Sequence, residues 1–404
     1  MELNYFRRGF GLKAEIAGPL SSDYSSDVVE TLRARGNELQ VGPLTFRLAQ
    51  EFGFCYGVDR AVEYAYESRT KFPDRRLLLV GEIIHNPHVN DKLRSMGIVF
   101  LERCADGEFD FGSITPDDVV LLPAFGVTMT DFNRLRAIGC IVVDTTCGSV
   151  LNVWKRVEAY ARDGFTAVIH GKHYHEETKA TASQVERHAA GRYIVVFDMA
   201  EAKQLTGFIE HGGDAEALSR QFAAKSSPGF DFASDLQRIG VANQTTMLAG
   251  ETMAVAAEFR RAFEARFGAE HLTDHFRAFD TLCSATQERQ DAVQQLLQDP
   301  PDLMVVVGGY NSSNTRALAA LAQDSGVRAL HISDSDSIDP VAGTLAHQPV
   351  RTKHEEVLTS WLGPAQVIGI TAGASTPNNK IGETIVAIAR SAGLETELRA
   401  ALRD

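Results

Sequence analysis

Three stretches of the chain share one order of apolar and polar positions. Each has a short apolar segment that ends at a cysteine, and apolar residues spaced three and four positions apart then follow, as in an amphipathic helix. A run of mostly β-branched and leucine residues comes next and ends at a glycine, at 77–81, 167–171 and 304–308. Such short runs, bounded by glycine and polar residues, predict buried strands.

The spacing from cysteine to glycine is nearly constant in the three stretches, whose cysteines are Cys55, Cys147 and Cys283. A second apolar run follows in each stretch, at 119–122, 241–243 and 367–372. Strands that alternate with helices predict parallel sheets with right-handed crossovers, with polar loops gathered at the carboxyl ends of the strands. The pattern therefore predicts three similar α/β domains with their loop faces turned towards one another.

The predicted domains span residues 41–147, 148–280 and 281–404, and residues 1–40 form an N-terminal extension. The middle domain is the longest, and residues 200–237 account for the excess. This segment is rich in glycine, serine and charged residues and lacks strong periodicity. We expect it to be a surface insertion.

Composition and charge narrow the class of protein. The chain has 404 residues and a net charge of −13, and this acidity argues against a nucleic-acid or anionic-membrane partner. No apolar run is long enough to span a membrane, and the first residues are too acidic for a transit peptide. Five widely spaced cysteines do not resemble a disulfide framework. We expect a reducing compartment, the bacterial cytoplasm rather than a plastid stroma.

The repeated cysteines are candidate metal ligands. A single cysteine at a strand end is typically a small buried side chain, but three in equivalent positions on one loop face favour three thiolates meeting at one point. Three sulfurs cannot complete a four-cysteine zinc site, yet they can hold three irons of a 4Fe-4S cluster and leave the fourth iron open. Cys104 and Cys140 lie outside the repeat, and we expect them to be structural.

Polar loops follow the glycines, at 82–88, 173–177 and 311–314. Their hydroxyls, amides and imidazoles can bind phosphate oxygens together with backbone N–H groups. Taken alone, Ser-Ser-Asn at 312–314 is more typical of a helix N-cap than of a binding site. A competing hypothesis makes His173, His175 and Glu177 a mononuclear metal site, but it leaves the three repeated cysteines unexplained.

Eight motifs extend this pattern, and they are Gly-Phe-Cys-Tyr-Gly-Val at 53–58, Glu-Ile-Ile-His-Asn-Pro at 82–87, Asp-Thr-Thr-Cys at 144–147, His-Glu-Glu at 175–177, Asn-Gln-Thr-Thr at 243–246, Cys-Ser-Ala-Thr-Gln-Glu-Arg-Gln at 283–290, Ser-Ser-Asn at 312–314 and Ala-Gly-Ala-Ser-Thr-Pro at 372–377. Their types and order resemble the LytB or IspH family of 4-hydroxy-3-methylbut-2-enyl diphosphate reductases. The resemblance covers about residues 40–390. The long N-terminus and the middle insertion resemble the branch found in photosynthetic organisms.

The resemblance implies a trefoil of three α/β domains around a central 4Fe-4S cluster. It also implies the last step of the non-mevalonate isoprenoid pathway, in which (E)-4-hydroxy-3-methylbut-2-enyl diphosphate is reductively dehydroxylated to isopentenyl and dimethylallyl diphosphates. By the same resemblance, ferredoxin or flavodoxin would supply the electrons. The charge and the lack of a long apolar run separately lead us to expect no nucleic-acid or membrane partner.

Site residues carry over from the resemblance position by position. Cys55, Cys147 and Cys283 would bind the cluster, whose open iron would act on the substrate hydroxyl as a Lewis acid. Glu177 would be the proton source, with help from Thr245. The residues that would hold the diphosphate are His85, His175, Thr245, Ser312, Ser313, Asn314 and Ser375.

One position departs from the common pattern of the family. Many members carry a histidine where this chain has Phe125, so one diphosphate contact is missing. Two alternatives stay open beside the reductase. One is a non-redox 4Fe-4S enzyme, such as a hydro-lyase or a quinolinate-synthase-like enzyme, and the other is a redox sensor or electron carrier. Glu177 and Thr245 beside diphosphate-type loops favour the reductase.

Overall fold

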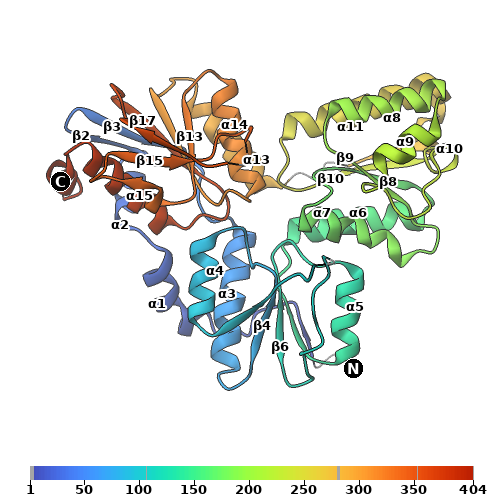
Figure 1. The fold of residues 1–404 in the computed structure, drawn as a ribbon, viewed down its shortest axis with the longest axis horizontal. Helices are drawn as coiled ribbons and strands as arrows, with labels where there is room; N and C mark the ends of the chain where they lie inside the picture. The colour runs from blue at the N-terminus through green and yellow to red at the C-terminus, as the bar shows by residue number, and fades with distance from the viewer. Residues whose placement is uncertain (1–3, 106, 280–282, 353, 404) are drawn as a thin grey trace. The chain divides into compact units, whose positions relative to one another are not determined.

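The computed structural model describes residues 4–105, 107–279, 283–352 and 354–403 of the chain (Figure 1). It divides into two compact units, each made of stretches that are separate in the sequence. Unit 1 comprises Met1–Arg8, Asp74–Gly81 and Ile98–Cys283, and unit 2 comprises Gly9–Pro73, Glu82–Gly97 and Ser284–Asp404. Both units combine small, mainly parallel sheets with helices, which confirms the predicted α/β fold class.

The first sheet of unit 1 has five parallel strands in the order β1-β7-β6-β4-β5. They span Tyr5–Phe6 (β1), Leu77–Val80 (β4), Ile98–Leu101 (β5), Val119–Leu122 (β6) and Ile141–Asp144 (β7). One face of β4, β6 and β7 packs against helix α5 (Met129–Ile138), where Leu135 is fully buried. The predicted strands at 77–80 and 119–122 are confirmed, and the N-terminal segment adds an edge strand to them.

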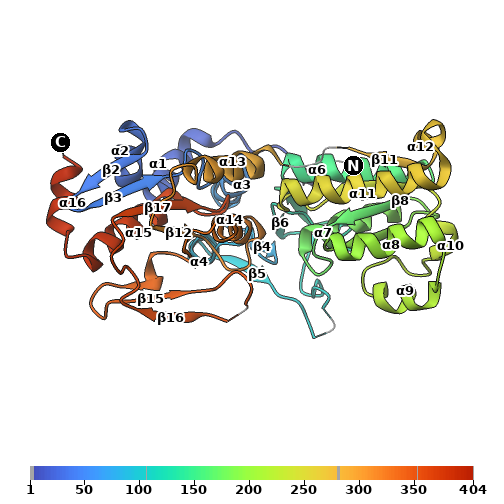
Figure 2. The same cartoon turned by 90° about the horizontal axis from the view of Figure 1, so that it is seen from above.

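The second sheet of unit 1 has four parallel strands in the order β11-β10-β8-β9. They span Thr166–His170 (β8), Tyr193–Val196 (β9), Ile239–Asn243 (β10) and Phe276–Ala278 (β11). Side chains alternate along β8, so Val168 packs with helices α8 (Met199–His211) and α11 (Ala249–Phe267), while Ile169 packs with α6 (Gly148–Arg162). Helices therefore cover both faces of this sheet (Figures 1 and 2).

The sequence indicated a surface insertion without strong periodicity at 200–237, and the structure shows that the segment is largely helical. This segment lies in helices α8, α9 (Ala215–Phe222) and α10 (Phe232–Asp235). Its apolar side chains Leu205, Phe222 and Phe232 are buried in the core on one face of the second sheet. Glycine and charged residues between the apolar positions obscured the helical period, yet burial against the sheet stabilises these short helices.

The main sheet of unit 2 has five strands in the order β13-β12-β17-β3-β2. They span Glu38–Val41 (β2), Leu44–Leu48 (β3), Leu303–Val307 (β12), Ala329–Ile332 (β13) and Val367–Ala372 (β17), and all neighbouring pairs are parallel except β2 and β3. One face packs against α2 (Asp27–Ala34), α15 (Asn378–Ser391) and α16 (Glu395–Ala401), and the other against α13 (Ser284–Leu296) and α14 (Ser313–Asp324).

The pairing of β3 with β17 joins the two ends of the sequence in one sheet. Residues 9–73 accordingly belong to unit 2, together with the C-terminal part of the chain. The three-domain boundaries and the threefold arrangement proposed from the sequence stay predictions.

A second, three-stranded antiparallel sheet in unit 2 was not foreseen, and it consists of β14 (Ile338–Asp339), β15 (Thr344–His347) and β16 (Glu356–Thr359). The remaining helices are α1 (Lys13–Tyr24), α3 (Tyr56–Lys71), α4 (Pro87–Ser95), α7 (Glu176–Ala182) and α12 (Leu272–His275), with 3-10 turns η1 (Ser183–Arg187), η2 (Ala269–His271) and η3 (Ser335–Ser337). Among the described residues, no helix is both long enough and apolar enough to cross a membrane.

Candidate active site

Two polar loops of unit 2 begin at the same edge of its main sheet. Val307 and Ala372 are partners in the β12–β17 register, and the Gly373 N–H donates to the Val307 carbonyl at 3.0 Å. Both strands are parallel, so the loops 308–312 and 373–377 leave their carboxyl ends side by side. This placement confirms the expectation that polar loops gather at one edge.

The Ser-Ser-Asn motif is buried in this loop pair, with Ser312, Ser313 and Asn314 between 2% and 6% exposed. Ser312 does cap α14, since its hydroxyl accepts from the Thr315 N–H at 3.3 Å. Asn314 Oδ1 accepts from the Ala374 N–H at 2.9 Å and so fixes one loop to the other. The N-cap interpretation and a binding role are therefore compatible.

His85 and Ser375 belong to the same group of unit 2. The Ser375 hydroxyl donates to the His85 carbonyl at 3.3 Å, and His85 Nδ1 lies 2.9 Å from the Glu82 carboxylate. The carboxylate orients the imidazole ring through Nδ1. Sequence reasoning placed His85 in the site but gave Glu82 no role.

Cys55 stands directly before helix α3 in unit 2. Its N–H donates to the Ala374 carbonyl at 3.2 Å, which ties the cysteine turn to the loop of Ser375. The buried Arg289 guanidinium donates to the Gly53 carbonyl at 2.8 Å and to the Phe54 carbonyl at 3.0 Å. Arg289 thus positions this turn, a role that was missed although the residue stands six positions after Cys283 in a quoted motif.

Cys147 stands directly before helix α6 in unit 1, and its N–H donates to the Ala124 carbonyl at 2.8 Å. Burial raises the pKa of its thiol. Backbone N–H groups of Ser149 and Val150 donate to the sulfur and oppose this effect, and the charge of Cys283 adds to it. Cys147 and Cys283 are therefore close enough in unit 1 to interact electrostatically. The predicted segment before Cys283 falls on residues 280–282, which lie outside the described residues.

The loops that carry Glu177 and Thr245 also start at one edge. His170 and Asn243 are partners in the β8–β10 register. The Thr245 N–H donates to Glu177 Oε1 at 2.5 Å, and both residues are no more than 5% exposed. The Thr245 backbone and the Glu177 carboxylate are therefore in direct contact.

Gln244 fastens these two loops together. Its Oε1 accepts from the Lys172 N–H at 3.1 Å and from the Thr178 hydroxyl at 3.2 Å. The side chain is fully buried. Gln244 belongs to the Asn-Gln-Thr-Thr motif at 243–246, and this was the only indication of its role in the sequence. Its hydrogen-bond partners could not be predicted without the pairing of β8 with β10.

His175 is the N-cap residue of helix α7, and its Nδ1 accepts from the Glu177 N–H at 3.2 Å. In the neutral ring, Nε2 then carries the proton and can donate to an anion. The Phe125 ring lies edge-on to this imidazole, with 6.3 Å between the ring centroids. The residue that departs from the family pattern therefore packs against a predicted substrate ligand.

The alternative metal site of His173, His175 and Glu177 gains no support. His175 Nδ1 and one Glu177 oxygen accept hydrogen bonds from backbone N–H groups, while the His173 ring packs edge-on to Tyr174. Among the described residues, the ligand atoms of His173, His175 and Glu177 do not form a converging group that could hold a metal ion.

The predicted residues thus form two groups. Unit 1 holds Cys147, Cys283, His175, Glu177 and Thr245. Unit 2 holds the others, and they are Cys55, His85, Ser312, Ser313, Asn314 and Ser375. Cys104 is exposed, and Cys140 is buried in the core of the first sheet.

These loops at the carboxyl ends of parallel strands, with a buried carboxylate and partly buried thiols, define an α/β enzyme. The family model described as LytB protein matches residues 46–389. The chain belongs to the LytB family.

Curated relatives are similar over almost the whole length of the chain. A 4-hydroxy-3-methylbut-2-enyl diphosphate reductase of Thermosynechococcus vestitus is 45% identical, covering 95% of this chain and 93% of the relative. Proteins of the same name from Gloeobacter violaceus and Parasynechococcus marenigrum are 46% and 47% identical, over 95% and 94% of this chain and 92% and 94% of the relatives. All three names are those of reductases, so they do not support a hydro-lyase or an electron carrier.

Solved structures support the fold. The E-1-hydroxy-2-methyl-but-2-enyl-4-diphosphate reductase from Plasmodium falciparum has a TM-score of 0.63 at 20% identity, covering 85% of this chain and 87% of its own. A structure titled as the terminal enzyme of the non-mevalonate pathway has a TM-score of 0.52 at 24% identity, covering 85% and 98%.

Proposed function

We propose that this protein reduces (E)-4-hydroxy-3-methylbut-2-enyl diphosphate to isopentenyl and dimethylallyl diphosphates. The observation that carries the proposal is identity of 45–47% to reductases of this name across nearly the full chain. The Glu177–Thr245 contact supports it, because removal of a hydroxyl as water needs a proton donor held in place.

Membership of the LytB family implies an iron-sulfur cofactor, and we assign to it a 4Fe-4S cluster held by Cys55, Cys147 and Cys283. The donor set suits this group, since soft thiolates select iron-sulfur clusters. Cys55 and Cys147 each stand directly before a helix, and none of the described cysteines forms a disulfide. When bound, the cluster supplies electrons and a Lewis-acidic iron for the substrate hydroxyl.

Residues of unit 1 would donate the proton and hold its donor in place. Glu177 would carry it to the departing hydroxyl or to the carbon skeleton, while the Thr245 N–H keeps the carboxyl group from swinging away. Because His175 Nδ1 accepts from the Glu177 N–H, the neutral ring carries its proton on Nε2 and would donate it to an anionic oxygen without a change of tautomer. Their burial excludes water that would compete for the proton.

Residues of unit 2 would bind the diphosphate. The hydroxyls of Ser312, Ser313 and Ser375 and the amide of Asn314 are supplied by loops that hydrogen bonds fix to each other and to His85. Hydroxyl and amide donors bind phosphate oxygens without a lysine. Such fixed donors lower the entropic cost of holding the substrate.

A small redox protein, ferredoxin or flavodoxin, would supply the electrons. The acidic chain, with its net charge of −13, would need a local basic surface to dock such an acidic partner.

Cysteine variants test the proposal. We expect Cys55→Ser, Cys147→Ser and Cys283→Ser to lose most of the iron bound by anaerobically purified wild-type protein, measured by iron and sulfide analysis and Mössbauer spectroscopy. Cys104→Ser is the matched control, because this thiol is exposed and lies outside the repeated motifs. Full iron content in any of the three variants would exclude that cysteine as a ligand.

Turnover is a separate test. The purified protein with a chemical reductant should convert the allylic diphosphate into the two products, detected by mass spectrometry. A protein that binds the cluster yet leaves the substrate unchanged under strong reducing conditions would overturn the proposed reaction while retaining the cluster.

A further inference from the structure

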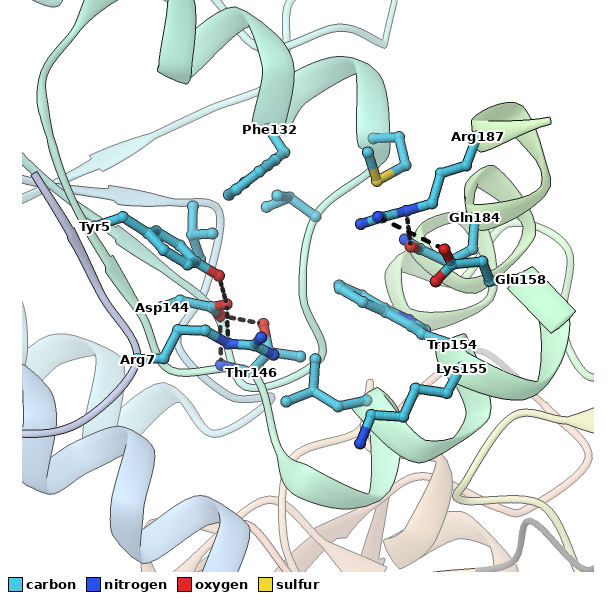
Figure 3. Close-up of a pocket in the computed structure, with 14 residues that line it drawn as sticks. Tyr5, Arg7, Phe132, Asp144, Thr146, Trp154, Lys155, Glu158, Gln184 and Arg187 are labelled. Carbon is cyan, nitrogen blue, oxygen red and sulfur yellow. Dashed lines mark hydrogen bonds and ion pairs between the residues drawn. The ribbon is translucent and has the colours of Figure 1, made fainter. Parts of the chain in front are cut away.

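A cavity of about 230 Å³ lies in unit 1, and Glu177 is not among the residues that line it (Figure 3). Its walls come from the N-terminal segment, from the segment that leads into α5, from α6 and from η1. Known ligand sites for drug-sized molecules span about 300–1,000 Å³, so this cavity suits a smaller molecule.

One part of the cavity wall is apolar. Val127, Phe132, Leu151 and the Trp154 ring contribute to it, and Phe132 and Trp154 lie on either side of the hollow in Figure 3. Gly126 is required here, because a Cβ at this position would collide with the Trp154 ring. The wall therefore accepts a short hydrocarbon body.

The acceptors in the cavity wall already have donors. The Asp144 carboxylate accepts from the Tyr5 hydroxyl at 2.5 Å and from the Thr146 N–H at 3.0 Å, and Arg7 Nε lies 3.4 Å from it. On the opposite wall, Arg187 pairs with Glu158 at 3.9 Å and donates to Gln184 at 3.3 Å (Figure 3).

Donors, by contrast, are left over. Lys155 has no ion pair among the residues that the structure describes. The Arg7 guanidinium is half exposed and has five N–H groups, which the single Asp144 carboxylate cannot all use. A ligand that offers acceptors and negative charge would complete this set.

We propose that this cavity binds a small amphipathic anion, a carboxylate or a phosphate monoester with a short apolar chain. The head group would lie between Arg7 and Lys155, and the chain would lie against Phe132 and Trp154. The N-terminal extension then has a binding role, since Arg7 and Tyr5 build the charged wall.

Fluorine NMR of the full-length holoenzyme tests the site, because the chain has two tryptophans, Trp154 and Trp361. Trp361 is buried in the core of unit 2 and serves as an internal control. With 5-fluorotryptophan incorporated, hexanoate and n-pentyl phosphate should shift the Trp154 signal in a saturable way and leave the Trp361 signal in place. A difference between these two probes identifies the preferred head group.

Two variants and a neutral probe make the test decisive. Arg7→Gln and Lys155→Gln should each weaken binding by about 3- to 30-fold, the loss typical of one charge-assisted contact. Arg134→Gln is the matched control, an arginine of the same unit that does not line the cavity. Equal shifts with 1-hexanol, equal affinity in the variants, or no saturable shift with either anion would each overturn the proposal.

Discussion

Asp144 shows how one buried side chain sets the geometry of a proposed cluster ligand. It is 4% exposed and accepts from Tyr5, from the Thr146 N–H and from the Thr146 hydroxyl. The turn that it closes leads directly to Cys147. Burial, and to a lesser extent the Asp144 carboxylate, raise the pKa of Tyr5. The Tyr5 hydroxyl therefore stays protonated and remains a donor at all ordinary pH values.

The first prediction concerns this carboxylate. Asp144→Ala leaves buried donors of Tyr5 and Thr146 without an acceptor, so the free energy of unfolding should fall by about 2–4 kcal/mol. Tyr5→Phe removes one donor and leaves the carboxylate in place, and it should cost about 1–2 kcal/mol. Urea denaturation of the apoprotein gives both values. Equal stability of Asp144→Ala and wild type would show that the turn does not depend on this network.

The second prediction separates Glu177 from its neighbour on the same helix. Glu177→Gln keeps an acceptor for the Thr245 N–H but cannot supply the proton, so kcat should fall by about 10²–10⁴-fold with iron content unchanged. Glu176→Gln alters the same helical turn and should retain activity within a few-fold. Steady-state kinetics of the three proteins settles the comparison, and similar kcat values for both variants would remove Glu177 from the proton path.

At the scale of elements, buried histidines fasten strand ends to the sheets. His331 on β13 lies 2.8 Å from the Gly308 carbonyl through Nε2, at the point where the loop to Ser312 leaves β12. This bond fixes the neutral tautomer with Nδ1 unprotonated, and the buried Nδ1 has no partner among the described residues. Burial is the main cause that lowers the pKa of His331 to about 4; the hydrogen bond to Gly308 opposes it, and the charges of Arg316 and His347 contribute to it.

The third prediction follows from this pKa. The unfolded chain binds the proton near the ordinary value of about 6.5, so stability is fully present above that pH and falls as the pH drops towards 4. When the pH is lowered from about 7 to about 5, protonation of His331 in the unfolded chain should lower the free energy of unfolding by about 2 kcal/mol. This contribution should be absent in His331→Phe. His211→Phe, an exposed histidine, is the control and should keep the wild-type slope. Denaturant titrations at several pH values measure the slopes, and identical slopes for His331→Phe and wild type would contradict the assignment.

The sequence predicted local elements better than their partners. The strands β4, β8 and β12 and the helices after Cys55, Cys147 and Cys283 follow from short-range periodicity. The pairing of β3 with β17 and the hairpin β15–β16 depend on contacts between distant or weakly patterned residues. In the site, the residue types were predictable, but Arg289 and Gln244 were not, because their partners are backbone groups placed by tertiary structure.

At the scale of the whole molecule, both units are assembled from separated stretches of one chain. The first residues show this most clearly, because Met1–Arg8 belong to unit 1 while the next stretch belongs to unit 2. Strand β1 pairs with β7, and the Val142 N–H donates to the Asn4 carbonyl at 2.7 Å. A terminus fixed in this way contributes to the stability of a core far away in the sequence.

The fourth prediction is a deletion of residues 2–8. It removes β1 and the Tyr5–Asp144 bond, so amide protection in β6 and β7 should fall by about 2–4 kcal/mol, while protection in β12 and β17 stays the same. Native-state hydrogen exchange read by mass spectrometry resolves the two regions. Equal loss in both units would mean that they unfold as one, and no loss in either would mean that β1 is dispensable.

The pairing of β3 with β17 sets an order of events during biosynthesis. The ribosome makes β3 and Cys55 long before it makes β17, the strand that pairs with β3 in the same sheet. Until then the nascent chain exposes an unpaired strand edge, and the turn of Cys55 lacks its Ala374 partner. Loading of iron at this proposed ligand therefore belongs after β17 has emerged, and a chain truncated before β17 would lack the contact that fixes the Cys55 turn.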